Sequence, residues 1–300
     1  MKHSSSVNWR QVGFMTLADL RRTLRGGSGL FFLFVIILVG WILLAIVTNP
    51  LDRLVLEEGS GMLAQASPAV ITQQIAVFFG PVIAWWIDAP SEYADPVVHL
   101  ITARPAVMSL FLIMFAGFIP FTSCLVGCDQ MAADLANRHA RVILLRTGRV
   151  ELMLSRFFGV VLFSALVSLV LVLFVAGFIA TKLPGFDPML LLLWGLQGWM
   201  ALVVISLPYL ALTSWLSLVV RSPGMVFILS LLVTTAFIVI TKILAGQFGL
   251  PWLEKFSPWG WKYGLFHPDM SVLLTSLSVL LLFAFALLGL ARYNLVRRDC

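Results

Sequence analysis

The sequence predicts an all-α polytopic membrane protein with six transmembrane helices. The chain is 60% hydrophobic and only 11% charged, and its mean hydropathy is +1.00, a composition typical of integral membrane proteins. Six apolar runs are each long enough, at about 1.5 Å per residue, to cross about 30 Å of hydrocarbon. Because peptide groups inside a bilayer must hydrogen-bond to one another, these runs are expected to be helical. The expected spans are residues 30–48, 106–128, 157–181, 188–220, 225–246 and 272–293.

A basic amphipathic helix is expected before the first span, within a cytoplasmic segment of residues 1–29. Between Asn8 and Arg25, apolar residues recur at helical spacing and arginines occupy the remaining face. This pattern is typical of a helix in the membrane plane, and the glycines of residues 25–29 predict a flexible connection to the membrane domain of residues 30–300. The helix would be a simple anchor or a lever against a partner, and the sequence favours neither. Its interfacial residues are Trp9, Arg10, Leu17, Leu20, Arg21 and Arg22.

Two further segments are expected outside the hydrocarbon core. The apolar run of residues 75–86 contains Gly80 and Pro81 and is too short to span, so we expect it to be re-entrant or interfacial. The segment Leu250–Met270 is rich in tryptophan and is expected to lie as a belt at the membrane interface.

The charge distribution predicts that both termini lie in the cytoplasm. With six spans, one side of the membrane carries 14 basic residues against five acidic ones, and the other side carries six against nine. Basic residues gather in cytoplasmic loops. Between the second and third spans, five arginines form a block that would cost roughly 12–18 kcal/mol at the bilayer centre, so it must lie outside the hydrocarbon. These are Arg138, Arg141, Arg146, Arg149 and Arg156.

The arginines of the block alternate with apolar residues such as Leu145, so the block is expected to form short amphipathic helices interrupted at Gly148. An apolar face of this kind suits the docking of a partner. The alternative is that the arginines only set the topology and contact anionic head groups, and this explanation remains open.

Catalytic and metal-binding signatures are absent from the sequence. It contains no GxxxxGK[ST] phosphate loop, no GxSxG and no HExxH, so we expect no enzyme activity and no cofactor in this chain. The spans contain almost no ionisable residues, which disfavours ion-coupled transport. Cys124 and Cys128 share one helix face and could offer two thiolates to a metal such as Cu(I), but buried cysteines are commonly small hydrophobic residues and we predict no metal site.

The whole pattern resembles the permease subunit of an ABC-2 type ABC transporter. The resemblance covers nearly the entire chain, from the in-plane helix to the tail at Arg297–Asp299. Permeases of this family commonly carry, after the second span, an acidic residue followed by elements similar to R-P-[VI]-S-R and L-x-G-K. Here Asp134 opens the block, Arg146-Thr147-Gly148-Arg149 stands in place of the first element without its proline, and Leu154-Ser155-Arg156 replaces the second.

The resemblance implies that Asp134–Arg156 is a coupling helix region that binds a separate ATPase subunit, which would hold ATP and Mg²⁺. Two such subunits and a second permease copy, identical or different, would assemble in a bacterial inner membrane. The assembly would move a lipid-like, glycan, peptide or drug substrate, or do mechanical work on an extracytoplasmic envelope partner. It would contact membrane lipids and no nucleic acid. The alternative is a non-transporting scaffold or assembly protein of an envelope complex. The implied coupling residues are Asp134, Arg138, Arg141, Leu145, Arg146, Arg149, Glu151 and Arg156.

Overall fold

The computed structural model describes residues 7–25, 27–57, 73, 104–132, 134, 147–182, 186–220, 222–248 and 251–297. All regular elements among these residues are helices, and six of them are long and apolar enough to cross a membrane. The predicted all-α polytopic fold with six spans is therefore confirmed. The six helices are α2 (Gly27–Glu57), α5 (Ala106–Gly127), α8 (Arg149–Lys182), α9 (Pro188–Val219), α10 (Pro223–Phe248) and α12 (Met270–Arg297).

The predicted spans correspond to these helices, but α2 continues to Glu57, beyond the predicted end at residue 48, and α8 begins before its predicted span. Hydropathy placed the third span from residue 157, whereas α8 begins eight residues earlier at Arg149. The extra turns carry Arg149, Glu151 and Arg156, which are too polar for a hydropathy window but compatible with a helix that extends beyond the apolar region. The last part of the basic block is thus the beginning of a spanning helix.

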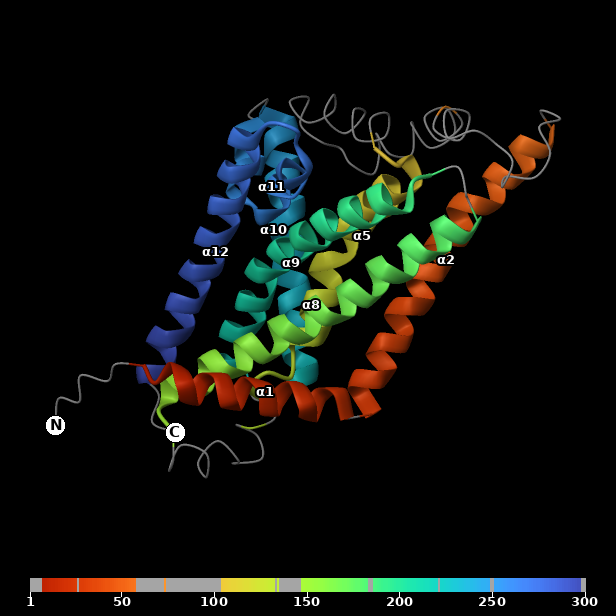
Figure 1. Cartoon of the computed structure of the whole chain (residues 1–300). Helices are drawn as coiled ribbons and strands as arrows, with labels where there is room; N and C mark the ends of the chain where they lie inside the picture. The colour runs from red at the N-terminus through yellow and green to blue at the C-terminus, as the bar shows by residue number, and fades with distance from the viewer. Residues whose placement is uncertain are drawn as a thin grey trace.

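Helix α1 (Trp9–Arg25) lies across one end of the helix bundle (Figure 1). The C-terminal end of α12 lies at this same end of the bundle, as six crossings between α1 and the C-terminus require. The elbow between α1 and α2 depends on Gly29, since a Cβ at this position would overlap the backbone carbonyl of Thr23.

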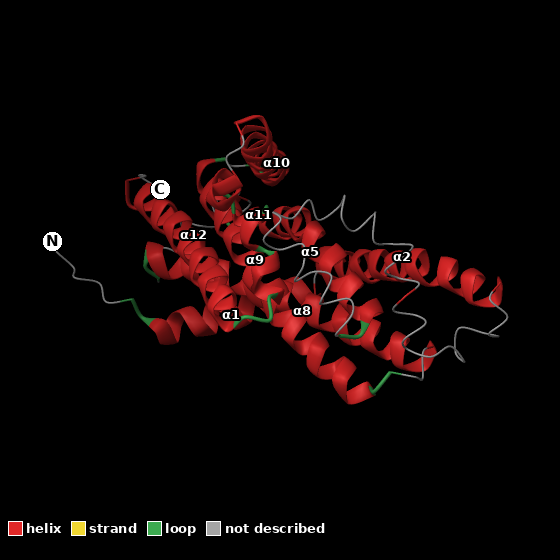
Figure 2. Ribbon diagram, turned by 90° about the horizontal axis from the view of Figure 1, so that it is seen from above, coloured by secondary structure: helices red, strands yellow, loops and turns green. Residues whose placement is uncertain are grey.

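Helix α9 is the centre of the bundle and packs against α5, α8, α10 and α12. The core between α5, α8 and α9 includes a polar contact, in which Trp194 Nε1 donates to Ser109 Oγ at 3.0 Å. Of the apolar stretch that could span the membrane, 61% of the residues are buried in α5, compared with 22% in α10 and 17% in α12. The last two helices therefore expose most of their apolar surface, and Figure 2 shows α10 at the edge of the bundle.

The segment between α10 and α12 forms a helical cap at the end of the bundle opposite α1. It comprises η2 (Pro251–Phe256), α11 (Pro258–Trp261) and η3 (Tyr263–Phe266). Trp252 and Phe256 are exposed, as expected of an interfacial belt, whereas Tyr263, Leu265 and Phe266 are buried in the main core. The cap therefore packs into the bundle as well as covering it. Residues 75–86, predicted to be re-entrant or interfacial, lie outside the described residues.

Candidate functional site

The candidate site lies at the end of the bundle that carries α1, where this helix crosses the beginning of α8. Val12 and Thr16 of α1 are buried at the crossing, and Thr16 Oγ1 donates to the backbone oxygen of Ser155 at 3.3 Å. Gly159 of α8 allows the close approach, because a Cβ there would lie 3.2 Å from the Cβ of Asp19. The two helices are thus in direct contact between Ser155 and Gly159 of α8.

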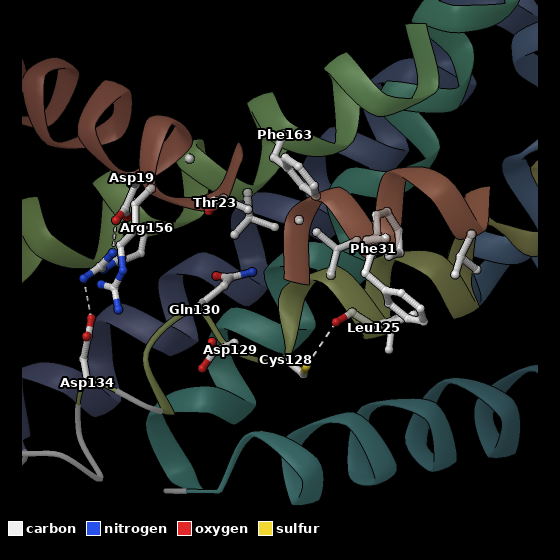
Figure 3. A pocket seen from close by; sticks show the side chains of 17 residues that line it. Asp19, Thr23, Phe31, Leu125, Cys128, Asp129, Gln130, Asp134, Arg156 and Phe163 are labelled. Carbon is white, nitrogen blue, oxygen red and sulfur yellow. Dashed lines mark hydrogen bonds and ion pairs between the residues drawn. The ribbon is translucent and has the colours of Figure 1, made fainter. Parts of the chain in front are cut away.

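Arg156 is at the centre of this contact and forms ion pairs with two carboxylates from different parts of the chain (Figure 3). One partner is Asp19 of α1, and the other is Asp134, whose Oδ2 lies 2.5 Å from Arg156 Nη2. The side chains of Arg156 and Asp134 are 13% and 7% exposed. A guanidinium carries several N–H donors in a planar fork and can serve two carboxylates at once. Arg156 therefore joins α1, α8 and the beginning of the basic block.

A second link holds the end of the basic block. Glu151, in the first turn of α8, is buried and accepts a hydrogen bond from the backbone N–H of Asn8 at 3.4 Å. The Glu151 carboxylate lies against Gly148, and a Cβ added to Gly148 would overlap that carboxylate. A carboxylate in the first turn also interacts favourably with the helix dipole. Two buried acidic residues, Asp134 at the beginning of the block and Glu151 near its end, are therefore both tied to the α1–α8 contact.

Beside these ion pairs lies a cavity of about 510 Å³ between α1, α2, α5 and α8. One end is polar and contains Arg156 and Gln130, and the other end is apolar and contains Phe31 and Leu125 (Figure 3). The complete lining consists of Asp19, Arg22, Thr23, Gly29, Phe31, Phe32, Val35, Leu125, Val126, Cys128, Asp129, Gln130, Asp134, Arg156, Gly159, Val160 and Phe163.

Of the residues predicted to couple to an ATPase, the structure brings Asp134, Glu151 and Arg156 together at the α1–α8 contact. All three interact within the chain, so they hold the block in position. Arg149 is half-buried at the beginning of α8. The remaining predicted coupling residues, Arg138, Arg141, Leu145 and Arg146, lie outside the described residues.

The predicted interfacial residues of α1 divide into two groups. Trp9 and Leu17 are 64% and 53% exposed, and the arginines at positions 10, 21 and 22 are exposed as well. Leu20 instead packs against the main core. The helix thus buries one face against α8 and leaves an apolar face and a basic face open, which is the arrangement expected of a helix in the membrane plane.

Asp19, Gly159 and Gln130 also belong to the site, although no motif in the sequence marks them. Asp19 is the only acidic residue of α1 and lies on the same helix face as the buried Val12 and Thr16. An acid at a buried position of a basic helix is a signal that a cationic partner lies nearby. Gly159 and Gln130 carried no such signal, because their roles depend on neighbours distant in sequence.

Cys124 of α5 and Cys128, which directly follows this helix, make separate contacts. Cys124 Sγ lies 4.0 Å from Thr234 Oγ1, whereas Cys128 Sγ donates to the backbone oxygen of Leu125 at 3.0 Å. Within the described ranges, no group of three or more His, Cys, Asp or Glu residues is placed to hold a metal ion.

Comparison of the sequence with models of known protein families finds no match, and comparison with curated proteins finds none either. The fold places the protein in the class of polytopic helical membrane proteins.

Proposed function

We propose that this chain is the membrane-spanning permease subunit of an ABC-2 type exporter, which couples ATP hydrolysis by a separate ATPase subunit to movement of a substrate. The proposal combines the resemblance of the basic block with the six-helix architecture. The single observation that supports it most is the attachment of both ends of the block to the same contact between α1 and α8.

This attachment suits a coupling element. A partner that moves the block would pull on Asp134 at its beginning and on Glu151 near its end. Asp134 is paired with Arg156, and Glu151 is bonded to Asn8, so the displacement would reach both α1 and α8. Because α8 continues across the bundle and packs against the central α9, the movement would continue into the spanning helices. Packed helices transmit such movements as rigid elements.

The exposed surfaces of the bundle are compatible with a larger assembly. Helices α10 and α12 leave most of their apolar surface uncovered within the chain. In a permease, part of this surface would face lipid and part would face a second permease copy.

The experiment that tests the function begins with purification of the native complex and identification of its proteins by mass spectrometry. We expect an ATPase subunit with Walker motifs. The substitution Leu145→Asp should then abolish ATPase binding while membrane insertion stays normal, because it removes apolar contact without removing positive charge. Truncation of a buried charged contact at such an interface, as in Arg146→Ala, costs about 2–5 kcal/mol, which corresponds to at least a roughly 30-fold loss of affinity.

The matched controls use arginines. Arg146→Ala, within the block, should weaken ATPase binding in the same way, whereas Arg25→Ala, on the exposed face of α1, should leave it unchanged. Normal ATPase binding by a correctly inserted Leu145→Asp protein would contradict the coupling role. A stable native assembly without any ATPase subunit would favour the alternative, a scaffold of an envelope complex.

A further inference from the structure

One side of α1 carries a stripe of two arginines and two large apolar residues, called here the α1 stripe. At about 100° per residue, all four fall within a narrow sector of the helix. They are Arg10, Phe14, Leu17 and Arg21. Both arginines are exposed, and Phe14 and Leu17 are 65% and 53% exposed. The Cζ atom of Arg10 lies 5.9 Å from the centroid of the Phe14 ring, so charged and apolar surface lie side by side.

The α1 stripe lies on the side of the helix that faces away from α8. Val12 and Thr16 are buried against the bundle, and Asp19, on the same side of α1, pairs with Arg156 of α8. The middle of the stripe is turned from the middle of this buried side by about 160° around the helix axis. Figure 2 shows α1 at the edge of the bundle, beside α8. The stripe therefore points away from the bundle.

The position of α1 along α8 sets the level of the stripe in the membrane. The contacts of α1 are at Ser155 and Gly159, inside α8 rather than at its first residue. The apolar run of α8 begins at residue 157, between these two contacts. At its other end α1 finishes at Arg25, and the spanning helix α2 begins at Gly27. Helix α1 is thus at the boundary between head groups and acyl chains, where arginines and large apolar side chains are both accommodated.

The charge of the α1 stripe is not compensated within the chain. Asp19, the only acidic residue of α1, faces the other way and is paired with Arg156. Over the described part of the chain, no ion pair involves Arg10 or Arg21. Basic residues are attracted by a membrane surface of net negative charge, whereas a zwitterionic surface has no net charge to offer. The complement of the stripe is therefore an anionic surface.

Lipid is also the molecule that lies next to the stripe. Helix α2 follows α1 after a single residue, and its first turns expose Leu30 and Phe34, at 58% and 62%. These side chains belong to a helix that is long and apolar enough to span the membrane, so lipid covers them. A lipid surface can therefore extend from the beginning of α2 onto α1.

We propose that the α1 stripe binds the anionic phospholipids of the membrane surface. Arg10 and Arg21 contact the lipid phosphates, which a guanidinium binds with paired N–H donors. Phe14 and Leu17 contact the adjoining acyl chains. Because Arg156 holds the opposite side of the helix through Asp19, α1 is fixed between the bundle and the lipid. This assignment holds whether or not the chain belongs to a transporter.

The test uses the full chain in nanodiscs that contain equal amounts of phosphatidylglycerol and phosphatidylcholine. One of the two lipids carries a photoreactive acyl chain in each sample, and labelled peptides are identified by mass spectrometry. We expect the phosphatidylglycerol probe to label α1 at least tenfold more, since each arginine near an anionic surface contributes about fivefold in affinity. Peptides containing Phe237, an exposed residue of α10, should be labelled equally by both probes.

Three variants separate charge from apolar contact. Arg10→Gln and Arg21→Gln should each lower the preference of α1 for phosphatidylglycerol about fivefold, because one charge is lost. Arg292→Gln is the matched control, since it removes an exposed arginine of α12 at the same end of the bundle, and it should leave the preference of α1 unchanged. Phe14→Ala should weaken the labelling of α1 by both probes alike.

Two further measurements use the wild-type chain, so they do not depend on how the variants fold. Salt at about 1 M, where the Debye length is about 3 Å, should abolish the preference, because the arginines are exposed. An excess of glycerol 3-phosphate should not reduce the labelling; full competition would assign the stripe to soluble phosphates instead. Equal labelling of α1 by the two probes, or a preference that survives high salt, would overturn the proposal.

Discussion

Arg156 of α8 is ion-paired with Asp19 of α1, although 137 residues separate them in the sequence. The pair fixes the in-plane helix against a spanning helix at the point where the basic block begins. Its side chains are 13% and 19% exposed, so water screens the interaction less than at an open surface. Position and orientation of α1 therefore depend on a partly buried charge pair rather than on apolar contacts alone.

The first prediction concerns this pair. Arg156→Met should destabilise the folded chain by about 2 kcal/mol or more, because it leaves Asp19 and Asp134 near each other without their cation. The measurement is unfolding in detergent. Asp19→Asn combined with Arg156→Met should cost less than the sum of the single changes, which is the sign of direct coupling. Arg21→Met, on the exposed face of α1, serves as control and should have little effect. Additive losses in the double variant would show that the two residues act independently.

The second prediction concerns the close approach of α1 and α8. Gly159→Val should cost about 1–3 kcal/mol and loosen α1, because even the first added carbon would lie 3.2 Å from the Cβ of Asp19. Gly177→Val, in the same helix, meets no atom within 4 Å of the added Cβ and controls for the change in helix propensity. Hydrogen exchange of the α1 backbone should accelerate in the first variant only. Equal protection of α1 in both variants would refute the steric role of Gly159.

The third prediction concerns Lys262 in the cap opposite α1. Its side chain is 1% exposed and its Nζ has no hydrogen-bond partner, although Nζ lies 2.7 Å from the ring centroid of Trp259 and 4.6 Å from that of Tyr263. Burial lowers the pKa of Lys262 well below its usual value, and the charge of Lys242 lowers it further. Contacts of an ammonium with aromatic rings stabilise it by about 2 kcal/mol, whereas desolvation of a buried cation costs several kcal/mol. Burial therefore disfavours the charged form of Lys262 relative to the neutral amine.

The stability of the protein should therefore rise with pH. The unfolded chain binds the proton of Lys262 more tightly than the folded chain does, so stability is lost as pH falls from the unfolded pKa, near 10.4, toward the lowered folded pKa. Lys262→Met should raise the Tm at pH 7 by at least a few degrees, since one kcal/mol corresponds to about 2–4 °C at 150–250 residues. This gain should shrink as pH approaches about 10. Lys182→Met, at an exposed lysine, should show neither effect, and a Lys262→Met protein less stable than wild type at pH 7 would disprove the argument.

The fourth prediction concerns the side of the membrane on which the basic block lies. A reporter fused after Arg149 or after Cys300 should be cytoplasmic, and a reporter fused after Glu58 or Lys262 should be outside. The expectation follows from the excess of basic residues on one side of the six spans. An outside location for the fusion after Arg149 would contradict the orientation and would also remove the basis for ATPase coupling.

The spanning helices and the amphipathic α1 were predictable because their signals are local. A run such as residues 225–246 is helical in a bilayer for reasons of length and hydrogen bonding, whatever its neighbours are. The spacing of apolar residues and arginines in α1 likewise specifies two open faces without reference to the rest of the chain. For the same reason, hydropathy placed the beginning of α8 too late, because the polar residues from Arg149 onward interrupt the apolar signal.

The amino-acid sequence by itself determined the six apolar helices and the amphipathic helix that precedes them. Only the tertiary structure decided that Arg156 pairs with Asp19 and Asp134, that Gln130 bonds to Leu210 and Thr213, and that Lys262 is buried. The physical reason is the distance along the chain over which each feature is determined. Helix formation in a membrane depends on the composition of one segment, whereas a charge pair or a buried hydrogen bond depends on which distant segments packing brings within about 3 Å.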